Sequence, residues 1–201
     1  KTLRAVQAAV ELADPAFPDL ADFEACFTHF ATYLADRVAF ITFHQSMQYE
    51  DVVESIRPSL GNVVDADPGY ETDNEGGEAT DGDRSGGSDE RGEHASDALN
   101  YKLHAGPIMR MIRRALDVES EEHVLVIDEI NRGDISRILG PLISSLEPDK
   151  RLGAEFPIGF ESQYPRASGP GSRIFIPANL HVIGTMNSAD RNIALVDHAL
   201  R

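Results

Sequence analysis

The sequence has little of several features that mark common classes of protein. A single cysteine, Cys26, excludes an internal disulfide, and the seven histidines never form H-x-x-x-H or lie at metal-ligand spacing from that cysteine. No window approaches the roughly 18 consecutive apolar residues that a membrane-spanning helix needs, and the first residues do not follow the pattern of a signal peptide. These absences argue against disulfide-stapled, structural-zinc and membrane proteins, and they favour a soluble cytoplasmic protein.

Basic residues are also scarce, since 18 lysines and arginines face 34 acids, a net charge of −16. Twelve acids and two arginines lie between Asp65 and Asp97, so this segment carries −10 and the rest only −6. Because its Gly, Asp, Glu and Ser cannot bury enough apolar surface to offset chain entropy, residues 65–98 are expected to form a disordered surface insertion. A role for it as an acidic contact surface stays open. The mild acidity elsewhere argues against a broad nucleic-acid-binding face.

The 201 residues, 41% of them hydrophobic, are enough for one α/β domain with a core. Three short apolar runs, at 38–43, 123–127 and 180–184, are typical of strands buried on both faces of a parallel sheet. Helices are predicted at 3–12, at 101–116 with an interruption near Gly106 and Pro107, and at 135–146, where Pro141 should produce a kink. Residues 151–176 read as a hairpin with a loose tip.

Polar side chains follow each predicted strand. The first run is followed by His44, Gln45 and Ser46, the second by Asp128, Glu129, Asn131 and Arg132, and the third by Thr185, Asn187, Asp190 and Arg191. In open α/β sheets ligands bind beyond the carboxyl ends of the strands, so the three clusters predict one shared site.

The stretch VLVIDEINR has the pattern in which a buried strand presents one carboxylate, Asp128, to a magnesium ion and a second, Glu129, to an attacking water. A complete G-x-x-x-x-G-K-[ST] phosphate loop is missing, but the chain opens with Lys1, Thr2 and a predicted helix, which is how such a loop ends. We therefore expect the sequence to begin inside the loop, with Lys1 at the β and γ phosphates and the Thr2 hydroxyl on magnesium. Each of these two patterns alone is common by chance, but the two together favour nucleotide binding.

Three segments together resemble one known family. FHQSMQYEDVVESIRP, VIDEINRGDISRILGPLISSLEPDKRLG and NLHVIGTMNSADRNIALVDHALR are similar to successive motifs of the McrB family of AAA+ GTPases, the motors of modification-dependent restriction systems. MNSADR is close to the family signature MNTADR, with Ser188 for threonine. The resemblance implies a P-loop NTPase of the AAA+ fold, with a parallel sheet flanked by helices. Residues 1–201 would be part of that domain, without its first strand and helical lid, and the acidic insertion lies outside the family pattern.

The resemblance also implies roles for individual residues. Asp128 would hold magnesium, Glu129 would orient or activate the attacking water, and Asn187 would contact the γ-phosphate or position water. The remaining matched residues are signature or interface positions: Asn131, Arg132, Asp190, Arg191, and Arg201 as the first of an arginine run. Arg132 would face the nucleotide of an adjacent subunit or form a surface salt bridge. The His44 to Asp51 stretch would brace the loop after its strand rather than take part in catalysis.

The implied activity is magnesium-dependent hydrolysis of GTP, or of ATP, by a homo-oligomeric ring, expected to be a hexamer. The ring would work with an McrC-like nuclease and reach modified DNA through parts outside this sequence. Two alternatives stay open: an ATP-driven remodelling protein of the MoxR-like group, and a ring scaffold that binds nucleotide without hydrolysing it.

Overall fold

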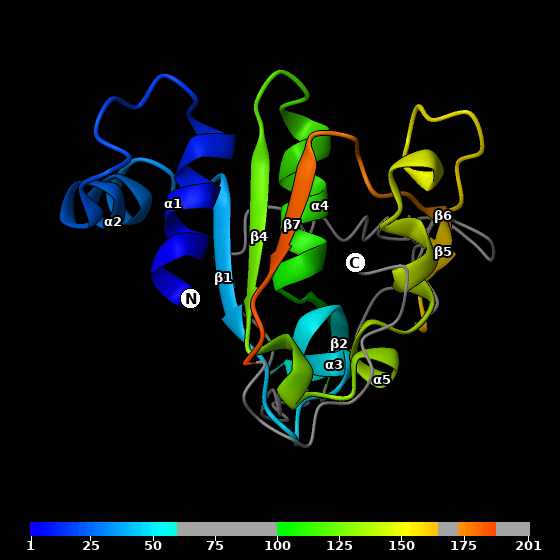
Figure 1. Ribbon diagram of the computed structural model, residues 1–201. Coiled ribbons are helices and arrows are strands. Elements are labelled where there is room, and N and C mark those ends of the chain that lie inside the picture. The colour runs from blue at the N-terminus through cyan, green and yellow to red at the C-terminus, as the bar shows by residue number, and fades with distance from the viewer. Residues whose placement is uncertain (60–99, 165–172, 188–201) are drawn as a thin grey trace, which may run out of the picture. The chain divides into compact units, whose positions relative to one another are not determined.

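The computed structural model describes residues 1–59, 100–164 and 173–187 (Figure 1). The insertion predicted at 65–98 and the signature residues Asp190, Arg191 and Arg201 lie outside these described residues. The chain divides into two compact units, Lys1–Ile56 with Leu103–Arg201, and Arg57–Lys102. The architecture that follows is that of the first unit.

The centre of this unit is a sheet of three parallel strands in the order β1-β4-β7. The strands are β1 (Val38–Thr42), β4 (His123–Asp128) and β7 (Leu180–Gly184), which confirms the three predicted strands. β4 is buried along almost its whole length, whereas β1 and β7 are only partly covered. The expectation that all three strands are buried on both faces was therefore wrong for β1 and β7. These two are the outer strands of the sheet that the described residues form.

Helices cover the sheet. α1 (Thr2–Ala13) confirms the helix predicted at 3–12, and its buried face consists of small side chains that allow it to lie close to β4: Ala5, Val6, Ala9, Val10 and Ala13. Val124 and Val126 of β4 share a core cluster with that face. Leu125 and Ile127 point to the opposite face and are also buried. α4 (Pro107–Asp117) packs on β4 as well and lies behind the sheet in Figure 1.

α2 (Phe23–Thr32) is a helix that the sequence patterns did not predict. The Asp22 carboxylate caps it by accepting hydrogen bonds from the backbone N–H groups of Glu24 and Ala25, at 2.9 and 3.3 Å. Cys26 lies on its inner face and is buried, as expected for a small apolar side chain.

Two predicted helices are shorter than expected, and each is limited by a glycine. The first half of 101–116 is a strand, β3 (Asn100–Ala105), which pairs with β2 (Glu54–Ser59), and α4 begins only at Pro107. A proline disfavours helical geometry in the residue before it and suits the first helical position, so the helix cannot extend backward through Gly106. In 135–146, α5 (Ile135–Leu139) ends where Gly140 takes φ +51°, and a 3-10 helix η2 (Gly140–Ser145) follows. The interruption at Pro141 is thus an end and not a kink.

Short elements complete the unit. They are α3 (Tyr49–Val52), the 3-10 helices η1 (Ile130–Arg132) and η3 (Pro148–Lys150), and the antiparallel pair β5 (Phe160–Glu161) and β6 (Arg173–Ile174). The pair confirms the predicted hairpin, whose tip lies outside the described residues. None of the helices in the described ranges is long and apolar enough to cross a membrane.

Candidate functional site

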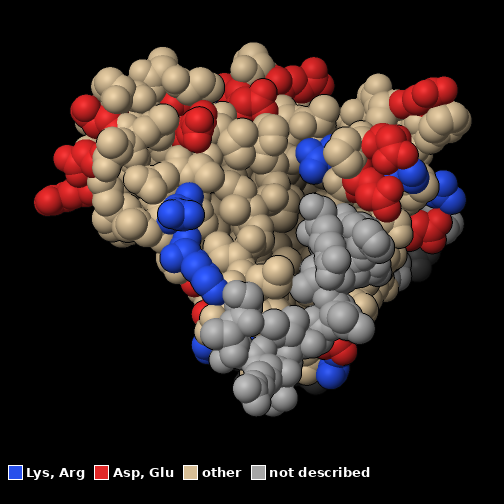
Figure 2. All heavy atoms as spheres, viewed as in Figure 1, with Lys and Arg blue, Asp and Glu red and all other residues tan. Residues whose placement is uncertain are grey.

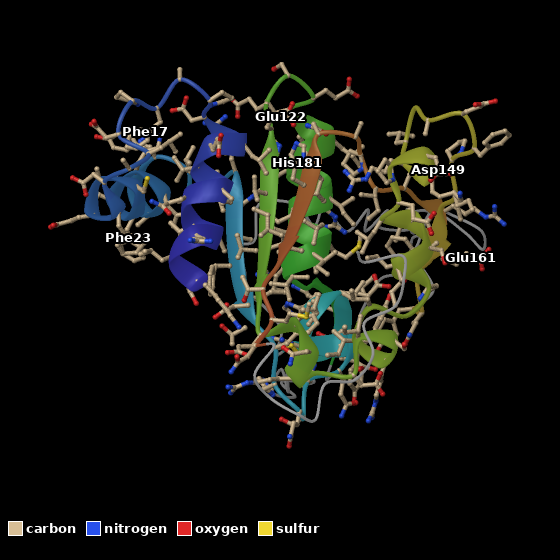
Figure 3. All side chains as sticks on the ribbon, in the orientation of Figure 1. Phe17, Phe23, Glu122, Asp149, Glu161 and His181 are labelled. Carbon is tan, nitrogen blue, oxygen red and sulfur yellow. The ribbon has the colours of Figure 1, made fainter. Side chains whose placement is uncertain are left out.

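The candidate site lies where the carboxyl ends of β4 and β7 meet the first turn of α1. The three strands are parallel, so their polar continuations emerge at the same edge of the sheet. Figure 2 shows basic side chains beside the start of α1, and acidic side chains along the opposite end of the sheet. That opposite end holds Glu122 and His181, which lie side by side in Figure 3 with the His181 Nε2 2.7 Å from Glu122 Oε2.

The first turn of α1 contacts both strand ends. The Thr2 hydroxyl is 3.3 and 3.2 Å from the two carboxylate oxygens of Asp128, to which it donates. The Lys1 ammonium donates to the backbone oxygen of Met186 at 2.8 Å and to Asn187 Oδ1 at 3.1 Å. Residues separated by 126 and 186 positions in the sequence are thereby brought to one place. Because the N–H groups of a helix's first turn have no partner within the helix, this end of α1 favours an anion.

Glu129, directly after β4, has an unusual backbone. Its φ of 53° and ψ of 43° are left-handed, a conformation that glutamate rarely adopts. Its Oε2 atom is buried and makes no hydrogen bond within the described part of the chain, although Arg132 Nε lies 3.2 Å away as an ion pair. Arg132 is the more exposed partner, with 55% of its side chain accessible against 26% for Glu129. In this structure Arg132 therefore forms the salt bridge that was one of its two expected roles.

The two strand ends are tied together at two further positions. The buried Asn131 accepts a hydrogen bond through its Oδ1 from the backbone N–H of Asn187, at 3.4 Å. The Thr185 hydroxyl donates to Asp128 Oδ1 and accepts from the Glu129 backbone N–H at 3.2 Å. The sequence placed Thr185 among the polar residues after the third strand but assigned it no role. Its position directly after the apolar run 180–184 is the sequence feature that could have indicated a role at the site.

The loop after β1 also reaches this edge of the sheet. The Phe43 backbone N–H donates to the backbone oxygen of Asp128 at 2.9 Å, and Ser46 Oγ lies 3.0 Å from His44 Nδ1. Farther along, Asp51 Oδ2 accepts from the Gln48 backbone N–H at 2.9 Å. These contacts are the bracing of the loop that was expected of this stretch.

Two of the side chains at the site supply oxygen ligands suited to magnesium. Thr2 and Asp128 supply neighbouring oxygen atoms, which are the ligands that magnesium prefers, and the ion usually takes only one or two protein carboxylates together with phosphate and water. Within the described ranges no group of three or more His, Cys, Asp or Glu side chains is arranged to hold a metal. The residues therefore fit magnesium bound jointly with a phosphate group, and they do not form an all-protein cage.

Comparison with known proteins gives a family match and two relatives. Residues 91–201 match the family model described as AAA domain (dynein-related subfamily). The chain is 26% identical over 165 residues to the type IV methyl-directed restriction enzyme EcoKMcrB subunit of Escherichia coli (strain K12), covering 82% of this chain and 27% of that protein. It is 26% identical over 107 residues to the type II restriction enzyme BsuMI component YdiS of Bacillus subtilis (strain 168), covering 51% and 31%. The chain thus spans less than a third of the length of either relative.

Proposed function

The chain belongs to the AAA domain family, dynein-related subfamily, as a McrB-like member, and on this premise we propose that it is the nucleotide-hydrolysing motor of a modification-dependent DNA restriction system. The observation that carries the proposal is the contact of the Lys1-Thr2 helix start with Asp128 on β4 and Asn187 after β7. A cation, a hydroxyl, a carboxylate and an amide meet there at a helix N-terminus. This is the combination that phosphoryl transfer uses.

We propose that the residues at the start of α1 and at the ends of β4 and β7 bind the metal and the phosphates. Thr2 and Asp128 would hold a magnesium ion, and that ion would supply positive charge to the phosphates of the nucleotide. Lys1 binds the phosphates as a second cation, at the end of α1 that favours anions. Asn187, whose Oδ1 is 3.1 Å from the Lys1 ammonium, is proposed to contact the γ-phosphate or to position water.

Glu129 orients the attacking water and accepts its proton. Its buried Oε2 is paired with Arg132 Nε at 3.2 Å and makes no hydrogen bond within the described residues, and a carboxylate oxygen has a further lone pair that can accept one from water. The ion pair with Arg132 holds the carboxylate near the strand end. Arg132 is also proposed as an interface residue, together with Asp190, Arg191 and Arg201, and its exposed guanidinium is available to a neighbouring subunit.

The finer parts of the proposal rest on the relatives and on the MNSADR segment. Both relatives are described as parts of restriction enzymes. We propose GTP as the nucleotide, a ring of identical subunits, of which a hexamer is the expected form, and an McrC-like nuclease as partner. DNA would be reached through parts of the protein outside this sequence.

Phosphate release by the full-length protein tests the proposal, with GTP and ATP compared, and with and without the nuclease partner. Glu129→Gln should lower turnover by about 100-fold or more, because a positioned general base contributes about 10²–10⁴-fold. Glu122→Gln is the matched control, since Glu122 pairs with His181 at the opposite end of the sheet and should leave turnover unchanged.

The outcomes separate the alternatives. GTP-selective turnover that collapses in Glu129→Gln but not in Glu122→Gln supports the restriction motor. ATP-selective turnover would assign the protein to the MoxR-like remodelling group. The absence of turnover with either nucleotide, with or without the partner, would favour the non-hydrolysing scaffold.

A further inference from the structure

Thr185 bonds to four consecutive residues across the end of β4. Its backbone N–H donates to the oxygen of Ile127 at 2.8 Å, and its hydroxyl donates to the Asp128 carboxylate. The same hydroxyl accepts from the Glu129 N–H at 3.2 Å, and its backbone oxygen accepts from the Ile130 N–H at 2.8 Å. The turn that carries both acids is thus held from the neighbouring strand by one residue.

The direction of these bonds follows from the chemistry of a hydroxyl group. A threonine has one proton to donate and two lone pairs that accept. Since the Asp128 carboxylate can only accept when ionised, the proton of Thr185 Oγ1 points to Asp128, and a lone pair receives the Glu129 N–H. One hydroxyl therefore fixes a side chain, that of Asp128, and a backbone, that of Glu129.

The backbone of Glu129 needs such support. A non-glycine residue in the left-handed region is strained, and such a conformation persists only where its surroundings hold it. Thr185 binds the N–H of Glu129 through its hydroxyl and the N–H of Ile130 through its carbonyl. The peptide groups on both sides of the Glu129 α-carbon are therefore anchored to the same residue.

We propose that Thr185 is a positioning residue of the hydrolytic site, which sets the orientation of the metal-binding carboxylate of Asp128 and of the water-orienting Glu129 together. This inference rests on the proposed function. Thr185 acts through the two acids, and its own hydroxyl is already engaged by them. It is thereby distinguished from Asn187, two residues farther on, whose amide lies beside the Lys1 ammonium.

Replacing the hydroxyl with a methyl group isolates this role. Thr185→Val keeps the branched shape but leaves the Glu129 N–H without its acceptor and Asp128 Oδ1 without one donor. Loss of a hydrogen-bond partner behind a metal-binding carboxylate costs about 10–100-fold in metal affinity or activity. We therefore expect turnover to fall, and the magnesium concentration for half-maximal turnover to rise, each by about tenfold or more. Thr185→Ser, which keeps the hydroxyl, should restore both.

The experiment uses the full-length protein as wild type, Thr185→Val, Thr185→Ser and the control Thr42→Val. Thr42 lies opposite Asp128 in the register of β1 and β4 and is exposed, so the control makes the same substitution at the same level of the sheet. Three quantities are measured: phosphate release against magnesium concentration, the magnesium dependence of binding of a fluorescent GTP or ATP analogue, and amide hydrogen exchange around Glu129 without nucleotide. Thr185→Ala replaces the valine variant if the latter does not fold.

The inference is supported if amide exchange at Glu129 and Ile130 is faster, and the magnesium concentration required is higher, in Thr185→Val but not in Thr185→Ser or Thr42→Val. Exchange and magnesium dependence equal to those of Thr42→Val would overturn it, even if turnover is normal in the wild type. A wild type that hydrolyses neither nucleotide would overturn the proposed function instead. The binding and exchange measurements would in that case still decide whether Thr185 sets the metal site.

Discussion

Two serines of the same unit should respond to alanine substitution with opposite signs. Ser145, in η2, is fully buried, and its hydroxyl has no hydrogen-bond partner in the described part of the chain. Ser162, just after β5, lies within hydrogen-bond distance of the Glu54 carboxylate and 2.8 Å from the oxygen of Tyr164, and it accepts from the Tyr164 N–H at 3.1 Å. The same chemical change thus removes an unsatisfied group at one position and a bonded group at the other.

The magnitudes follow from these surroundings. A buried, unsatisfied polar group costs about 1–3 kcal/mol, so Ser145→Ala should raise the free energy of unfolding by about 1 kcal/mol once the small void is allowed for. A hydrogen bond to a charged group contributes about 1.5–3 kcal/mol, and Glu54 is fully buried, so Ser162→Ala should lower the free energy of unfolding by about 2 kcal/mol. The Tyr49 hydroxyl, 2.9 Å from Glu54 Oε1, limits that loss.

Thermal unfolding of the parent protein measures both changes. For a unit of this size about 1 kcal/mol corresponds to about 2–4 °C in the unfolding midpoint, so the two variants should differ by roughly 6–12 °C. Ser144→Ala, at the exposed serine next to Ser145, is the control and should change the free energy of unfolding by less than about 0.5 kcal/mol. A lower midpoint for Ser145→Ala, or an unchanged one for Ser162→Ala, would refute the assignment of these hydroxyl groups.

Two further predictions concern buried positions. Burial lowers the pKa of His123, so the contribution of its neutral form to the free energy of unfolding is fully present above the unfolded-state pKa of about 6.5 and is lost as the pH drops from there toward the lower folded-state pKa. Between pH 8 and pH 5 the urea unfolding midpoint should therefore fall less in His123→Gln than in wild type. An equal fall in the two proteins would contradict this prediction. Gly106→Ala would place a Cβ 2.3 Å from the Val52 backbone oxygen, so it should lower the free energy of unfolding by about 1–3 kcal/mol or more. This loss should exceed that of the control Gly153→Ala, where nothing lies within 4 Å of the new Cβ but φ is +84°. Equal unfolding midpoints for the two variants would show that the Val52 backbone moves to make room for the methyl group.

The strands and their common edge could be predicted because the signals are local. Apolar runs such as that of β4 identify strands, and polar residues directly after two parallel strands must emerge together. The contact of the Lys1-Thr2 turn with Asp128 has no local signal. It was expected only because the downstream strand end gave the helix start a chemical partner.

The predictions about secondary structure and burial that were wrong depend on contacts between distant parts of the chain or on backbone conformation. Residues 101–105 form a strand because they pair with β2, a partner more than 40 positions away, and nothing in their own pattern excludes a helix. The partial exposure of β1 depends on its place in the strand order, which its composition does not encode. α5 ends at the positive φ of Gly140. A glycine can adopt this conformation, but its presence in the sequence does not show that it does so.

At Glu129, structure that the local sequence does not predict bears on the proposed function. Among the non-glycine residues that the structure describes, it alone has a positive φ. A glycine would adopt that conformation at less cost, but it would remove the carboxylate that is proposed to orient water. The chain instead has a residue of the required chemistry in a disfavoured conformation, and Thr185, directly after β7, holds the peptide groups on both sides of it. Because these restraints come from a residue beyond the end of β7, the strain at Glu129 and the need for Thr185 are two parts of one feature, and neither follows from the local sequence alone.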